Sequence, residues 1–291
     1  MIEGALIGAR FALMVDLALL MGLPLFWQVM GMPSSGPARR WVPVALALGG
    51  MALSALWLLV SVAGMTGTSI IAPDWASAQI VLTMTPIGTV LAVRGGALLL
   101  ALVSACAGRQ RLTLMAAAVA AATLAWTGHA GATEDMAGTV HRIADVAHIW
   151  AAAGWIGALT VLLHAALTVR PVTADMRRVA TMLSRFALMG TLIVATLVVS
   201  GAINGVMIVG LAQLPALMGS RYGLLLGAKL ALFGLMLGLA ALNRWRLTPR
   251  LEGGEPQHAI AHLRLSLLIE TSAAIAIIGL VAWLGTLDPM A

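Results

Sequence analysis

The chain has 291 residues, of which 61% are hydrophobic and only 10% are charged, and its formal net charge is +6. A typical soluble domain is about half apolar and about a quarter charged, so this composition excludes a water-soluble globular protein. It also excludes an intrinsically disordered chain, which needs low hydrophobicity and high charge. The sequence therefore predicts an all-α, polytopic integral membrane helix bundle in a lipid bilayer.

Eight apolar stretches are long enough to cross the bilayer, which takes roughly 20 residues per helix. They cover residues 4–30, 42–65, 86–107, 112–129, 140–168, 184–210, 223–243 and 263–286. Between the second and third stretches, Pro73 and Pro86 bracket a segment, 73–85, that is typical of a short interfacial helix. We therefore expect a single eight-helix transmembrane domain over residues 1–291.

Arginines gather in alternate connections between these stretches, which is a topology signal and not a nucleic-acid-binding surface. One side holds Arg39, Arg40, Arg109, Arg111, Arg170, Arg177, Arg178, Arg244, Arg246 and Arg250. The connections near 66–85 and 130–139 hold none, and the one near 211–222 holds only Arg221. The positive-inside rule assigns the arginine-rich side to the cytoplasm. Eight crossings then place both termini outside, which is the periplasm in a Gram-negative cell.

Two motifs that the sequence lacks reduce the number of possible functions. The sequence has no GxxxxGK[ST] phosphate-binding loop, so ATP-driven transport by this chain alone is not expected. Cys106 is the only cysteine, which excludes an internal disulfide and a CxxC metal site. We expect a binding or transport protein and not an enzyme.

Ionisable side chains inside the apolar stretches are functional candidates, because each costs several kcal/mol in a membrane unless it is satisfied. These residues are Arg10, Asp16, Arg94, His141, Arg142, Asp145, His148, His164, Lys229 and Glu270. Arg94 and Lys229 are expected to bind carboxylates or backbone carbonyls. Glu270 lies nearer the cytoplasmic side and is a candidate inner coupling site for a proton or an ion. The alternative for Glu270 is a structural pairing with Arg264 or Arg185.

The fifth stretch carries the most informative pattern. His141, Asp145 and His148 fall within about 60° of one another on a helix and descend about 10 Å from its outer end. His129 ends the fourth stretch one short loop away. Two or three imidazoles with a carboxylate suit Cu(II), Zn or Fe(II).

The pattern leaves several arrangements open. One shared ion, two half-sites completed by other helices, and a relay of sites all fit the 10 Å spacing. Alternatively, Asp145 pairs with Arg142, Arg10 or Arg94, and the histidines make structural hydrogen bonds between helices. Further outer-side ligand candidates are Met65, Met136, Asn204 and Met207.

Four groups of motifs resemble the bacterial copper resistance protein D (CopD) family, and their order and spacing match from about 126 to 289. They are Thr127–Ala130; Asp145–His148 followed by Ala151–Leu159; Ser200–Asn204 followed by Arg221–Leu230; and Leu242–Arg244 with Pro249, Glu270 and Asp288–Pro289. The first three stretches match this family only in hydropathy and span count.

The resemblance implies an eight-helix protein of the bacterial inner membrane that handles copper and moves it toward the cytoplasm. It supports His129 and His148 most directly as metal ligands, and marks Asn204, Lys229 and Glu270 as family-pattern positions. It also implies a separate periplasmic copper-binding partner of the CopC type. The ligands leave Cu(I) and Cu(II) both open. The alternatives are a b-type haem-binding membrane oxidoreductase and a copper dock or assembly factor that does not transport.

Overall fold

The computed structural model describes residues 2–32, 36–128, 131, 135–169, 173–210, 217, 219–249 and 256–288. In chain order its elements are α1 (Ile2–Val29), α2 (Pro37–Thr66), α3 (Trp75–Met84), α4 (Pro86–Cys106), α5 (Gln110–Ala122), the 3-10 helix η1 (Thr123–Thr127), α6 (Asp135–Thr168), α7 (Thr173–Val209), α9 (Arg221–Leu242), the π-helical turn η4 (Asn243–Leu247) and α11 (Pro256–Leu284). These described residues contain no strand, so the all-α prediction is confirmed.

Seven helices in the described part of the chain are long and apolar enough to cross a membrane: α1, α2, α4, α6, α7, α9 with η4, and α11. They coincide with seven of the eight predicted stretches and identify a multi-pass membrane protein. The stretch predicted at 112–129 differs, because α5 has only 13 residues and continues as the 3-10 helix η1. Helices α6, α7 and α11 begin earlier than predicted, since their more polar N-terminal segments fall outside the apolar windows.

The short helix expected at 73–85 is present as α3, and its boundaries follow from local chemistry. The Asp74 carboxylate caps α3 by accepting hydrogen bonds from Ser77 N at 3.1 Å and Ser77 Oγ at 2.7 Å. These hydrogen bonds hold the pKa of Asp74 below its usual value. At the other end, Thr85 caps α4, and Pro86 occupies the first turn of α4, where a missing N–H costs nothing.

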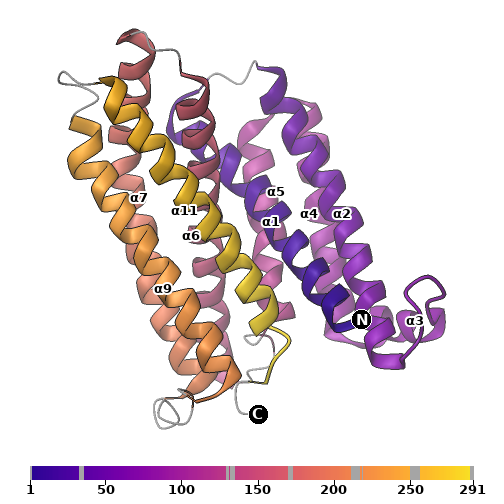
Figure 1. The fold of residues 1–291 in the computed structure, drawn as a ribbon. Coiled ribbons are helices and arrows are strands. Elements are labelled where there is room, and N and C mark those ends of the chain that lie inside the picture. The colour runs from indigo at the N-terminus through magenta and orange to yellow at the C-terminus, as the bar shows by residue number, and fades with distance from the viewer. Residues whose placement is uncertain are drawn as a thin grey trace.

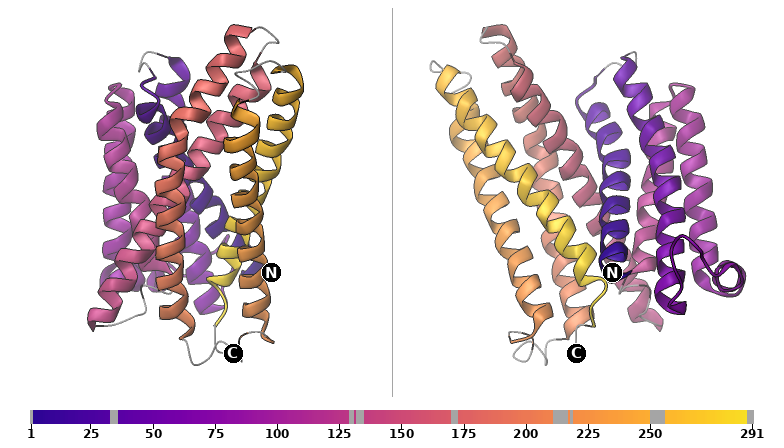
Figure 2. Two further views of the ribbon diagram at one scale, coloured as in Figure 1. Left: turned by 90° about the vertical axis from the view of Figure 1, so that its left-hand side faces the viewer. Right: turned by 45° about the vertical axis from the view of Figure 1, so that its right-hand side comes forward.

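The helices form two groups that lie side by side (Figures 1 and 2). One buried core lies among α1, α2, α4 and α5 and includes Leu17 and Leu98. The other lies among α6, α7, α9 and α11 and includes Leu162 and Leu263. The groups meet chiefly where α1 packs along α6. Both ends of the chain lie at the same end of the bundle, which we call the termini end (Figure 1).

Helices α1 and α6 touch backbone to backbone at one level. A Cβ atom on Gly22 would overlap the carbonyl of Ala153 and lie 3.0 Å from the Cα of Gly157. A Cβ atom on Gly157 would lie 2.6 Å from the Cα of Gly22. Only glycine permits such a close approach, so these two residues fix how the two helix groups meet.

Candidate metal site

The imidazole of His148 is held between α6 and α7. Its Nδ1 lies 3.0 Å from the hydroxyl Oγ of Ser200 on α7. Ser200 in turn donates to the carbonyl of Thr196 at 2.5 Å. Metal-bound histidines commonly use one ring nitrogen for such a positioning contact and the other for the metal. The ring also forms a hydrogen bond with the backbone of Leu197. With Nδ1 engaged by Ser200, Nε2 of His148 is the candidate metal-binding nitrogen.

Asp145 lies one turn from His148 on the same face of α6, and side chains three residues apart are neighbours on a helix. Its Oδ1 accepts a hydrogen bond of 3.0 Å from Asn204 Nδ2 on α7. The ammonium group of Lys229 on α9 interacts electrostatically with both Asp145 and His148. A carboxylate and an imidazole therefore share one polar position, with a cation from a third helix nearby.

The other two predicted histidine ligands are not part of this polar position. His141 is only 1% exposed and lies on the same stripe of α6, farther toward the termini end. His129 falls outside the described residues. Within the part of the chain that the structure describes, no three His, Cys, Asp or Glu side chains come together around one metal position. Asp145 and His148 thus form a pair of neighbouring side chains on α6.

The methionine candidates are positioned less firmly than the histidines. Met65, in the last turn of α2, and Met136, in the first turn of α6, are 73% and 80% exposed. Met207 lies one turn after Asn204 on α7 and is partly buried. Such exposed side chains gain little positional support from packing, so their role as ligands remains a sequence-based prediction.

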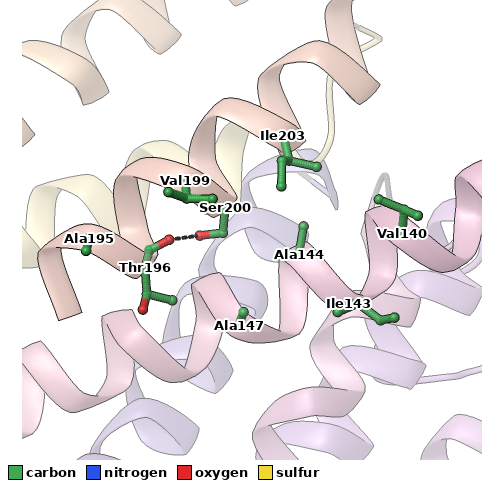
Figure 3. Close-up of a pocket in the computed structure, with 9 residues that line it drawn as sticks. All are labelled: Val140, Ile143, Ala144, Ala147, Ala195, Thr196, Val199, Ser200 and Ile203. Atoms are coloured by element: carbon green, nitrogen blue, oxygen red, sulfur yellow. Dashed lines mark hydrogen bonds between the residues drawn. The ribbon is translucent and has the colours of Figure 1, made fainter. Parts of the chain in front are cut away.

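An apolar groove of about 520 Å³ runs between α6 and α7 beside this pair (Figure 3). Its walls are Val140, Ile143, Ala144 and Ala147 of α6 and Ala195, Thr196, Val199, Ser200 and Ile203 of α7. Ser200 is a member of this lining and also contacts His148. The positioning contact of His148 therefore borders a groove whose other walls are almost entirely hydrocarbon.

A second cluster of polar side chains lies in the helix group that also contains the pair of Asp145 and His148. Glu270 on α11 is 2% exposed, and its Oε1 accepts hydrogen bonds from Asn243 Nδ2 at 2.5 Å and from Ser266 Oγ at 3.3 Å. The alternative pairing with an arginine is not observed. Arg264 donates to the carbonyls of Ala166 and Val169 and Arg185 to that of Met30.

Arg94 is fully buried and Arg10 is partly buried in the first helix group, and their hydrogen bonds go to a hydroxyl and a backbone carbonyl and not to a carboxylate. Arg94 donates from Nε to the hydroxyl of Thr123 at 2.7 Å, at the junction between α5 and η1. Arg10 donates to the carbonyl of Thr127 at 3.1 Å, at the end of η1. These arginines therefore fix the segment that precedes residue 129, and neither hydrogen bond reaches Asp145.

Comparison with known proteins places the chain in a family. The chain is 38% identical to the copper resistance protein D of Pseudomonas syringae pv. tomato, over 97% of this chain and 96% of that protein. The chain belongs to the copper resistance protein D family. The sequence model of that family matches residues 180–284, and the model of the N-terminal domain of copper resistance protein D-like proteins matches residues 1–139.

The family likeness extends beyond the motifs at 126–289, because the N-terminal match includes the first helices, where hydropathy alone had indicated a likeness. The chain is also 27% identical to the inner membrane protein YebZ of Escherichia coli (strain K12), over 62% of this chain and 60% of that protein. No solved structure matches the chain.

In this copper resistance protein D family member, three residues of the polar sites were not among the ligands that the sequence predicted. Ser200 was noticed only within a motif, and its contact with His148 depends on how α6 and α7 pack. Asn243 was likewise noticed only within the motif Leu242–Arg244, and Ser266 gave no signal, because hydroxyl and amide side chains are ordinary in membrane helices. The π-helical turn that follows α9 begins at Asn243, and no local pattern in the sequence predicts it.

Proposed function

We propose that this protein binds copper between α6 and α7 and moves it across the inner membrane toward the cytoplasm. The observation that carries the proposal is the pair formed by His148 and Asp145, each positioned by a polar residue of α7. Membership in a copper resistance family supplies the metal. The chain acts in this proposal as a transporter and not as an enzyme.

The ligand chemistry supports copper in either oxidation state. Imidazole and carboxylate from His148 and Asp145 suit Cu(II), whereas imidazole with thioether suits Cu(I). His141 continues the site along α6, and His129 and the outer methionines remain ligand candidates from the sequence. While no copper is bound, the ammonium group of Lys229 neutralises the carboxylate of Asp145. When copper binds, the copper ion replaces the ammonium group beside this carboxylate.

The proposed topology supports entry of copper from the periplasmic side. Both ends of the chain lie at one end of the bundle, which requires an even number of crossings (Figure 1). We therefore assign the eighth crossing to α5 together with η1, in addition to the seven long helices. The connections at the termini end are poor in arginine, so the positive-inside rule places that end in the periplasm. A separate periplasmic copper protein of the CopC type would deliver copper at this face.

Copper uptake by the purified protein in liposomes tests this function. With a copper-sensitive dye sealed inside, vesicles that contain the protein should report copper entry faster than protein-free vesicles. Copper that binds stoichiometrically without any entry, with a CopC-type partner supplied, would identify a dock in place of a transporter. A visible Soret band from the purified protein would instead indicate haem.

Ser200→Ala is expected to weaken copper binding by about 10–100-fold, because loss of an outer-shell partner leaves the imidazole of His148 unoriented. Copper titration of the purified protein measures the change in Kd. Thr196→Val is the matched control, since the Thr196 hydroxyl bonds the carbonyl of Leu192, within its own helix. Equal affinities for the Ser200 variant and the wild type would show that this contact does not position a ligand.

A further inference from the structure

Glu270, Asn243 and Ser266 form a polar site enclosed between η4, the turn that follows α9, and α11. Asn243 is 5% exposed, and its carboxamide Oδ1 has no hydrogen-bond partner among the described residues. Its backbone carbonyl begins the π-helical turn and accepts from both the amide and the hydroxyl of Thr248. A π-helical turn is a rare feature that is frequent at functional sites. Here it holds a buried amide with an unused acceptor beside a carboxyl group.

No cation of the described chain pairs with Glu270. Arg244, next to Asn243, donates to Thr191 of α7, and Arg264 of α11 donates to carbonyls of α6 and its C-terminal end. On α1, Arg10 donates to Thr127, and Asp16 packs against the glycines of α2. His164 of α6 is exposed. The groups that could balance a charge on Glu270 are therefore engaged elsewhere or face outward.

The donor atoms decide which ligand fits. A carboxyl, an amide and a hydroxyl offer only oxygen, whereas Cu(I) favours sulfur and imidazole. Hard divalent cations require about six or more oxygen ligands, more than these three side chains supply. A proton needs only one acceptor. It converts the carboxylate into a neutral O–H donor, which removes an unpaired buried charge and provides the donor that the Asn243 oxygen lacks.

We propose that Glu270, with Asn243 and Ser266, is a proton-binding site whose proton is exchanged during copper transport. The proton passes from water to the carboxylate of Glu270 and returns to water in each cycle. This inference deepens the proposed function, because it names the ion to which copper movement is coupled.

An apolar layer separates this site from the copper pair. Along α9, Lys229 and Asn243 are 14 residues apart, which corresponds to roughly 21 Å on a helix. Between them, Phe233 packs against Trp155 of α6, with ring centroids 5.9 Å apart, and Met236 is buried one turn farther on. Changes at Glu270 therefore leave the ligands at His148 and Asp145 untouched.

Copper accumulation under an imposed pH difference tests the coupling. For one coupled proton, a one-unit pH difference across the vesicle should change the copper accumulation ratio of the wild type by about tenfold. Glu270→Gln should abolish this response while stoichiometric copper binding remains, and Glu270→Asp should retain it. Thr271→Val is the control, because the hydroxyl of Thr271 bonds Leu267 within α11. A full response in Glu270→Gln, or none in a wild type that transports copper, would overturn the inference.

A measurement without copper keeps the proton site testable if transport fails. The infrared difference spectrum between wild type and Glu270→Gln should contain the C=O stretching band of a protonated carboxyl. Asn243→Ala should shift that band, because it removes a hydrogen-bond partner of the carboxyl group, whereas Thr271→Val should not. Absence of the band from the difference spectrum at every pH would refute the proton site, whatever the outcome for copper.

Discussion

Gly157→Ala is expected to be among the most destabilising single-methyl changes in this protein. The added Cβ would collide with the backbone of Gly22 on α1, and backbone atoms cannot move aside as a flexible side chain can. Overpacking in ordinary cores costs about 1–3 kcal/mol, and this site lies at or above the upper end of that range. Thermal unfolding in detergent should give a much lower midpoint temperature for Gly157→Ala than for the wild type. Gly22→Ala should lower this midpoint in the same way.

Two other helical glycines provide matched controls. A Cβ atom on Gly95 of α4 or Gly234 of α9 would meet nothing within 4 Å. Alanine at either position should be neutral or stabilising by about 0.5–1 kcal/mol, because glycine is a weak helix former. If Gly157→Ala and Gly95→Ala unfold at the same temperature, the backbone contact between α1 and α6 is not as close as described.

The largest effect on function is expected from the double substitution of His141 and His148 by alanine. Loss of His148 removes the imidazole that Ser200 positions beside Asp145, and loss of His141 removes the second imidazole of the stripe. Copper affinity should fall by more than about 100-fold, the upper range for losing merely an outer-shell partner. Equilibrium titration with copper, together with X-ray absorption to count imidazole ligands, measures both losses.

His164→Ala is the control for that experiment, because His164 is an exposed histidine near the other end of the same helix. Its removal should leave affinity and ligand count unchanged. The double variant must also retain the unfolding midpoint of the wild type, so that lost binding is not lost folding. Stoichiometric, tight copper binding by a folded double variant would eliminate the stripe on α6 as the metal site.

Hydropathy was sufficient to predict most of the fold. Spanning helices must satisfy their own backbone groups in lipid, so long apolar stretches translate directly into helices. The same rule is less informative for α5, where thirteen α-helical residues give way to a 3-10 helix at Thr123. Arg94 bonds that threonine, and no local pattern announces a contact between residues 29 positions apart.

The candidate site was predictable in its residue types but not in its partners. Helical periodicity places Asp145 and His148 on one face, and the structure positions both against α7. Periodicity cannot reveal which residues of α7 or α9 complete that face, because this depends on the rotation of each helix about its own axis. Ser200 and Asn243 illustrate the limit, since each acquires its role only through packing against another helix.

The glycine contact between α1 and α6 also constrains the order of assembly during synthesis. Gly22 is made early, but its partner at position 157 emerges only after the whole first helix group has been translated. At about 5–20 residues per second, roughly 7 to 27 seconds pass between them. During this interval the α6-facing side of α1 must contact lipid or the insertion machinery. Helix α1 is therefore synthesised well before it reaches its final packing.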